Sequence, residues 1–250
     1  MSLKKDNFPG KESLTRLHGR QKIQYIWDYY KLPMVIGLIF LYIIGYTVYG
    51  HFSKKEVLLY AGLVNVSPGE TLAAQLREGF LEFLGVNGAK ADLKLYTGLY
   101  LTDNPDDPNR EYAYASRIKI IASIDDERLD VVLMDKAAFD AFSQNGYLYH
   151  MEELLQNMDE KVAEELKPYL IKNIVILEDN REDMLLDGSL PYEAVTEEFF
   201  MGLLVSQKGL FKEAGFTDDV YLGVIKNSPR LDGAAEYIEY LYYSSVSGKR

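Results

Sequence analysis

The sequence contains no cysteine among its 250 residues and only three histidines. The absence of cysteine excludes disulfides, cysteine-ligated zinc and iron–sulfur sites, and a lipid-modified N-terminal cysteine. His18, His51 and His150 are too scattered to converge, which argues against a histidine metal centre or a Ser–His–Asp triad. Glycine-rich phosphate loops, GxSxG elbows, HExxH motifs and EF-hand spacings are also missing. We therefore expect no enzyme, no cofactor and no metal site.

Positive charge is also scarce, because 27 basic residues stand against 38 acidic ones and give a net charge of −11. Nucleic-acid phosphates require a basic surface, so nucleic acid is not an expected partner.

Residues 32–53, between Lys31 and Lys54, carry no formal charge over 22 positions. About 20 apolar residues in a helix cross a hydrocarbon core of about 30 Å. A buried helix of a soluble core is the alternative, but such helices usually keep a polar face. The sequence therefore predicts one transmembrane helix in the lipid bilayer at 32–53.

Charge predicts the orientation of that span. Residues 1–31 carry seven basic and three acidic residues, a net charge of +4, whereas the remainder of the chain carries −15. Short positive flanks stay in the cytoplasm. We expect a cytoplasmic basic tail at 1–31 and an extracellular α/β domain at 54–250.

Aromatic residues flank the span on both sides: Tyr25, Trp27, Tyr29 and Tyr30 before it, and Tyr46, Tyr49 and Phe52 at its end. Such rings favour the headgroup layers. A cleaved signal peptide is the competing interpretation, but its apolar region is usually about 7–15 residues long and ends in a small-residue site. We predict an uncleaved signal anchor in a cell membrane, and the cysteine-free outer domain fits a bacterial surface, particularly that of a Gram-positive cell.

The outer domain alternates strand-like and helix-like segments. Apolar or alternating runs predict strands at 57–66, 91–101, 130–134, 171–179, 194–206 and 220–228. Helical patterns occupy 70–84, 111–128, 136–143, 158–166, 207–215 and 231–243, and polar loops occupy 102–110 and 180–192. This order predicts right-handed crossovers and a parallel sheet covered by helices.

Two stretches resemble a known family. DVVLMDKAAFDAFSQNGYLYHMEELL at 130–155 and VYLGVIKNSPRLDGAAEYIEYL at 220–241 are similar to segments of type 2 periplasmic solute-binding proteins. The resemblance implies a parallel-sheet, solute-binding-like α/β domain. Because the outer domain has only about 200 residues, its second lobe, within 140–215, is expected to be reduced.

Parallel-sheet topology predicts where a ligand would bind. Ligands lie beyond the carboxyl ends of parallel strands, near helix N-termini. The candidate ligand-binding residues are Asn65, Ser67, Thr97, Asp135, Lys136, Asn227, Ser228 and Arg230. The same residue types commonly serve as turn and N-cap residues, which is the alternative for this set.

Other polar clusters have two interpretations each. The acidic loop from Asp103 to Glu111 offers oxygen ligands to calcium, but its prolines favour a solvated turn. Glu193, Glu197 and Glu198 form either a carboxylate pair for acid–base chemistry or an exposed charged edge. The 20 tyrosines either stack on sugars or pack within the fold.

Two functional hypotheses follow. The first is a membrane-anchored extracellular solute-binding-like protein that senses or captures a small-molecule ligand or serves as an accessory subunit of a membrane transporter. The second is an extracytoplasmic scaffold or assembly module that has lost ligand binding and acts by protein–protein contacts.

Overall fold

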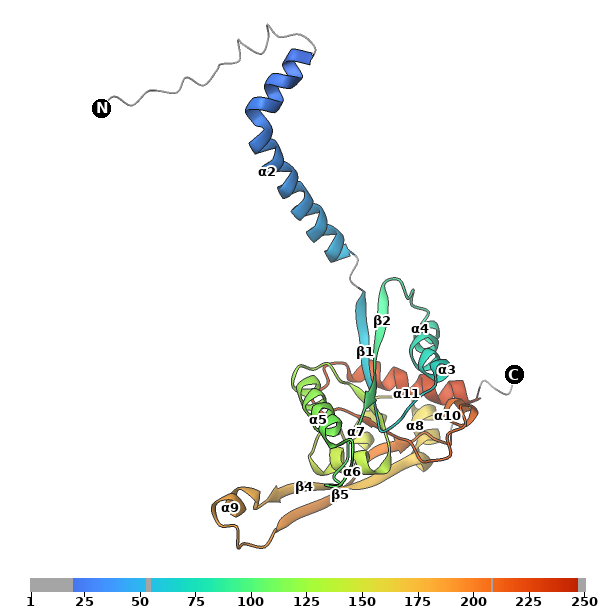
Figure 1. The fold of residues 1–250 in the computed structure, drawn as a ribbon. Coiled ribbons are helices and arrows are strands. Elements are labelled where there is room, and N and C mark those ends of the chain that lie inside the picture. The colour runs from blue at the N-terminus through green and yellow to red at the C-terminus, as the bar shows by residue number, and fades with distance from the viewer. Residues whose placement is uncertain (1–19, 53–54, 208, 247–250) are drawn as a thin grey trace. The chain divides into compact units, whose positions relative to one another are not determined.

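The structure is a computed structural model of the chain, and it describes residues 20–52, 55–207 and 209–246 (Figure 1). The chain divides into two compact units, Met1–Lys54 and Lys55–Arg250.

The described residues of the first unit form the helix α2 (Arg20–Phe52), which runs for 33 residues with Pro33 inside it. Its described side chains are those of Trp27 and residues 31–47, and all of them are exposed. Within the residues that the structure describes, no helix has the length and hydropathy of a membrane span, and the span at 32–53 stays a prediction. Most of the predicted basic tail lies outside the described residues.

The second unit is an α/β fold built on one six-stranded sheet. Its strands are β1 (Glu56–Val64), β2 (Ala91–Leu99), β3 (Val131–Met134), β4 (Leu170–Asp179), β5 (Ala194–Leu204) and β6 (Tyr221–Val224). They lie side by side in the order β2-β1-β3-β6-β5-β4. The α/β class and the six strands confirm the sequence-based expectation.

The expectation of a parallel sheet is confirmed only for the first three strands. The first three strands are parallel to one another, but β6 runs antiparallel to β3, and β5 and β4 each run antiparallel to their neighbours. Hydrophobic runs predict that a strand is buried and do not encode its direction. The mixed sheet follows from the later half of the chain.

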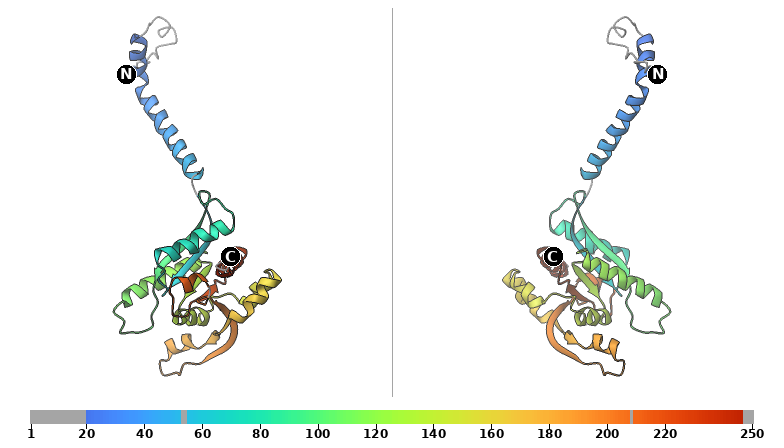
Figure 2. Two further views of the ribbon diagram at one scale, coloured as in Figure 1. Left: turned by 90° about the vertical axis from the view of Figure 1, so that its right-hand side faces the viewer. Right: turned by 90° about the vertical axis from the view of Figure 1, so that its left-hand side faces the viewer.

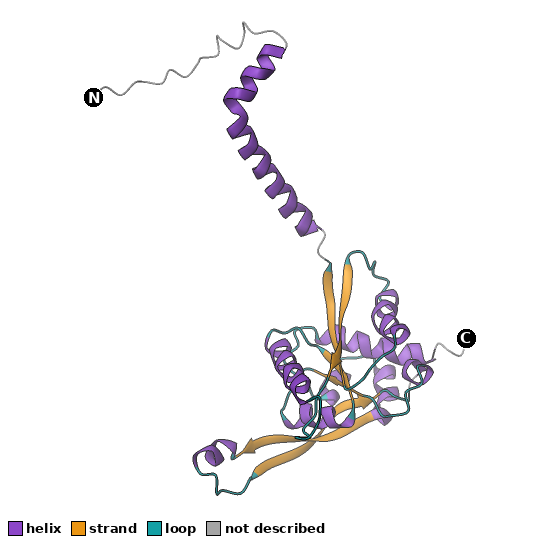
Figure 3. Cartoon of the chain, viewed as in Figure 1, coloured by secondary structure: helices purple, strands orange, loops and turns teal. Residues whose placement is uncertain are grey.

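Helices cover both faces of the sheet (Figure 3). The first face carries α3 (Glu70–Ala74), η1 (Gln75–Gly79), α4 (Phe80–Phe83), α7 (Met151–Gln156), α8 (Glu160–Leu166), α10 (Gly209–Glu213) and α11 (Leu231–Val246). The second face carries α5 (Arg110–Asp125) and α6 (Lys136–Gln144). In β3, Val131 and Leu133 face the first group and Val132 and Met134 face the second. This alternation is the period-2 pattern of a strand that is buried on both sides.

No second lobe forms where the sequence predicted one, at 140–215. This segment supplies α7, α8, the short helix η2 (Lys167–Tyr169), β4 and β5, and both strands join the single sheet. β5 joins the sheet by its antiparallel pairing with β6, and β4 follows as the edge strand because the link of fewer than 15 residues returns the chain antiparallel along its neighbour.

Instead of a lobe, β4 and β5 extend beyond the body of the unit as a two-stranded projection (Figures 1 and 2). We call residues 170–204 the arm. A short helix, α9 (Arg181–Leu186), lies at its far end, where the sequence predicted a plain loop.

Candidate functional site

Polar residues gather where the three parallel strands end. The carboxyl ends of β1, β2 and β3 are adjacent, and α6 begins directly after β3. An open cavity of about 720 Å³ lies there, which we call the strand-end pocket. Its polar lining consists of Asn65, Ser67, Thr102, Asp103, Asn109 and Asp135, with Tyr100 and Tyr112 beside them.

Asn65 connects the three strand ends. Its Nδ2 donates to the Leu101 carbonyl at 2.9 Å and to Asp135 Oδ2 at 3.1 Å, while its Oδ1 accepts the Leu101 N–H at 2.8 Å. Its φ of 58° is in the left-handed region, where Asn is among the residues most often found. The other carboxylate oxygen of Asp135 caps α6 by accepting the Ala138 N–H.

The acidic loop forms one wall of the strand-end pocket. Tyr100 donates to Asp107 at 2.6 Å, and this hydrogen bond lowers the pKa of the Asp107 carboxyl and raises the pKa of the Tyr100 hydroxyl. Asp103 pairs with Arg117 at 2.7 Å. Tyr100 and Tyr112 stack with ring centroids 6.4 Å apart, so an aromatic surface and carboxylates line the same cavity.

Several of these polar groups are bonded to one another or to neighbouring side chains. Among the described residues, no buried side-chain nitrogen or oxygen lacks a hydrogen-bond partner. Nor does that part of the chain contain a group of three or more His, Asp or Glu residues placed to hold a metal ion. The chemistry available here is stacking and surface hydrogen bonding around an acidic rim.

The predicted ligand-binding residues do not all converge. Asn65, Ser67 and Asp135 line the strand-end pocket, whereas Thr97 lies exposed within β2 and Lys136 pairs with Asp140 on α6. Asn227, Ser228 and Arg230 lie at the opposite end of the sheet. Because β6 is antiparallel to β3, its carboxyl end at Val224 is beside Val131, the first residue of β3.

At that opposite end, Ser228 and Arg230 bind a buried carboxylate. Asp130 has no exposed surface, and it accepts hydrogen bonds from Ser228 Oγ at 2.6 Å, Arg230 Nε at 2.8 Å and the Tyr60 N–H at 2.7 Å. Asn227 donates to the Ile124 carbonyl at 2.8 Å. All of these contacts are internal, which is the turn and capping interpretation of the sequence.

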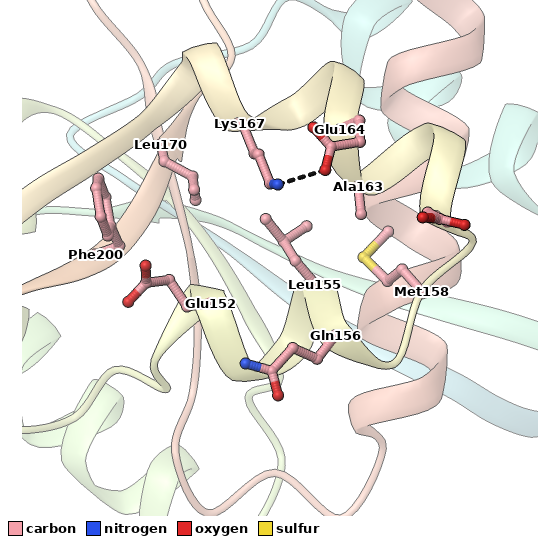
Figure 4. Close-up of a pocket in the computed structure, with 10 residues that line it drawn as sticks. Glu152, Leu155, Gln156, Met158, Ala163, Glu164, Lys167, Leu170 and Phe200 are labelled. Carbon is pink, nitrogen blue, oxygen red and sulfur yellow. Dashed lines mark hydrogen bonds and ion pairs between the residues drawn. The ribbon is translucent and has the colours of Figure 1, made fainter.

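A second cavity, of about 650 Å³, lies between α7, α8 and the base of the arm (Figure 4). We call it the acidic groove. Leu155, Met158, Ala163, Leu170 and Phe200 form its apolar lining. Its exposed rim carries Glu152, Gln156, Glu160, Glu164 and Lys167, and Lys167 pairs with Glu164. The sequence did not predict this second cavity.

The arm exposes apolar side chains at its tip. Leu185 and Leu186 of α9 are 87% and 89% exposed, and Leu190 and Tyr192 lie exposed in the link that follows. Glu193, Glu197 and Glu198 are also exposed, in agreement with a charged edge. The signal that sequence reasoning missed is the Leu185-Leu186 pair in a connection that the sequence predicts to be a polar loop.

No family model matches the chain, and neither a curated protein nor a solved structure matches it.

The Asp130 cluster generates a stability prediction. Replacing Arg230 by Met leaves the Asp130 carboxylate buried without its cation, which we expect to lower the free energy of unfolding by about 3 kcal/mol. Urea unfolding of the full chain measures this change. The control is Arg128→Met, whose pair with Asp126 is exposed on both sides and is expected to contribute about 0.5 kcal/mol or less. Equal losses in the two variants would contradict a structural role for the cluster.

Proposed function

We propose that the chain is a single-pass membrane protein whose 55–250 domain lies outside the cytoplasm and acts as a scaffold or assembly module through protein contacts made by the arm. The exposed apolar tip of the arm is the observation that carries this proposal. Apolar side chains gathered on a projecting element are typical of interaction surfaces.

The polar residues at the strand ends add support. The side chains of Asn65 and Asp135 form hydrogen bonds with each other, with the backbone of Leu101 and with the first turn of α6. A ligand that competed for these atoms would have to break hydrogen bonds that connect β1, the segment after β2 and β3. Such a competition reduces the net free energy of binding.

The anchor is part of the proposal. The 22 uncharged residues at 32–53, the basic residues before them and the flanking aromatic residues support a span with its N-terminus in the cytoplasm. The resemblance of 130–155 and 220–241 to type 2 solute-binding proteins supports an origin of the domain in that family. It also fits a location on the bacterial cell surface.

Protease treatment tests the orientation. Protease added to intact protoplasts that express the chain should degrade the 55–250 domain, because the domain lies outside the cell. A cytoplasmic marker protein should survive in the same sample. Protection of the domain until the membrane is permeabilised would contradict the proposed topology.

Cross-linking in membranes tests the role of the arm, and the cysteine-free chain allows a single reactive site to be introduced. A photoreactive group attached to Ser189→Cys should give a reproducible adduct with one protein, identified by mass spectrometry. We expect Leu185→Ser with Leu186→Ser to abolish the adduct, since most of the apolar contact area is removed.

The matched control removes two exposed isoleucines from α5, by Ile118→Ser with Ile121→Ser, and should keep the adduct. Urea unfolding of both double variants shows whether the fold is intact. An adduct that survives the arm substitutions, or that is lost equally in the control, would refute the arm as the contact surface.

Ligand capture, alone or as a transporter subunit, is the second candidate, and the stacked Tyr100–Tyr112 pair beside Asp103 favours it. This candidate predicts that a sugar, amino acid, peptide or metal ion raises the melting temperature of the full chain. At a concentration of about 100 Kd the stabilisation amounts to about 2.7 kcal/mol. Tyr112→Ala should abolish the shift, and Tyr114→Ala, on the same helix but outside the strand-end pocket, should retain it. The absence of any shift across the screen would exclude this candidate.

A further inference from the structure

The acidic groove combines an apolar interior with negative charge at its rim. Leu155 and Ala163 are buried, and Met158, Leu170 and Phe200 are partly buried. In Figure 4 the side chains of Leu155, Met158 and Ala163 point into the space between α7 and α8. Methionine adapts its shape to a partner, which suits a surface that receives another side chain.

The rim charges indicate the sign of the occupant. Glu152 comes from α7 and Glu160 from α8, so the two carboxylates belong to different elements that border the cavity. Neither forms an ion pair in the described part of the chain, whereas the lone rim cation, Lys167, is already paired with Glu164. Two carboxylates without an ion-pair partner therefore flank the apolar interior, and one cation, Lys172, lies over the Phe200 ring at 5.0 Å from its centroid.

We propose that the acidic groove binds an apolar segment of a partner protein that carries Lys or Arg on both sides of its apolar residues. Its apolar side chains fill the space over Leu155, Met158 and Phe200, and its cations face Glu152 and Glu160. This is the arrangement by which amphipathic segments dock in hydrophobic grooves. The inference goes beyond the proposed function, because it concerns a surface separate from the arm tip.

Charge excludes two other occupants. Helix α9 of a second copy would bring Glu182, Asp183 and Asp187 against the acidic rim, and like charges oppose that contact. An anionic lipid surface is repelled in the same way.

Defined peptides test the proposal with the full chain in phosphatidylcholine nanodiscs. The probe is a fluorescent peptide that has a central block of leucines and has lysines at both ends. Its binding is measured by fluorescence anisotropy, with empty nanodiscs as the blank. We expect binding that weakens by about tenfold when the lysines become glutamates or the leucines become serines, because both charge and apolar contact contribute.

Charge reversal at the rim gives the decisive comparison. The double variant Glu152→Lys with Glu160→Lys should have an affinity for the lysine peptide that is lower by about tenfold, and it should bind the glutamate peptide. Glu70→Lys with Asp125→Lys makes the same change in net charge outside the acidic groove and should leave both affinities unchanged.

Failure to bind above empty nanodiscs, or equal losses in the two double variants, would overturn the proposal. The arm variant Leu185→Ser with Leu186→Ser separates it from the proposed function. That variant should lose the cross-linked adduct of the arm and still bind the lysine peptide normally. If the arm substitutions abolish the adduct but no variant binds the peptide, the proposed role of the acidic groove is refuted and the proposed role of the arm is not.

Discussion

The rest of the second unit depends on the hydrogen bonds and the ion pair made by the buried carboxylate of Asp130. It lies just before β3 and accepts hydrogen bonds from the backbone of β1 and from the segment between β6 and α11. Arg230 also reaches the carbonyl of Glu127 and lies over the ring of Tyr60, at 4.8 Å from its centroid. One charged group thus holds together the parallel half of the sheet and the strand that reverses its direction. Removing a single partner of such a buried ion costs far more than the pair contributes on balance.

The reversal at β6 decides where functional surfaces form. In an all-parallel sheet the segments after every strand would meet at one end, and Asn227, Ser228 and Arg230 would have joined Asn65 and Asp135. With β6 antiparallel, those residues strengthen the opposite end. Beyond β6 the sheet continues in space through β5 and β4, and the length of these two strands beyond the body of the unit forms the arm. At the base of the arm, the buried Asn173 donates to Asp140 of α6 at 2.8 Å, and its Oδ1 accepts the Ile174 N–H. These bonds connect the edge strand to the body and occupy a backbone donor, which reduces its tendency to pair with other chains.

Most of the element order was predictable from the sequence, and the spatial arrangement was not. The spacing of hydrophobic residues predicts buried strands such as 130–134 and helices such as 136–143. Gly146 and Gly215 occupy turns with positive φ, as expected of glycine in such positions. Strand direction beyond the third strand depends on long-range pairing, for instance that of Leu203 with Leu222, which no local pattern encodes. For the candidate site, the position of Asn65, Ser67 and Asp135 followed from the parallel strands alone. The acidic groove was not predictable, because Leu155 and Phe200 are 45 residues apart and meet only through the pairing of β5 with its neighbours.

The placement of hydrogen-bonded polar groups and of exposed apolar side chains supports the proposal of protein contacts over that of small-ligand capture. At the strand-end pocket the side chains of Asn65, Asp135 and Tyr100 are already paired within the fold, so a ligand that bound these groups would exchange existing hydrogen bonds for new ones at little net gain. The arm tip exposes leucine side chains, and the acidic groove has an apolar lining below its charged rim, so a partner that covers them removes apolar area from water. Apolar burial at about 25 cal/mol per Å² is the dominant favourable term in association. The surfaces of the two proposed protein contacts therefore lie in the half of the domain that follows β3, where the sheet departs from a parallel arrangement.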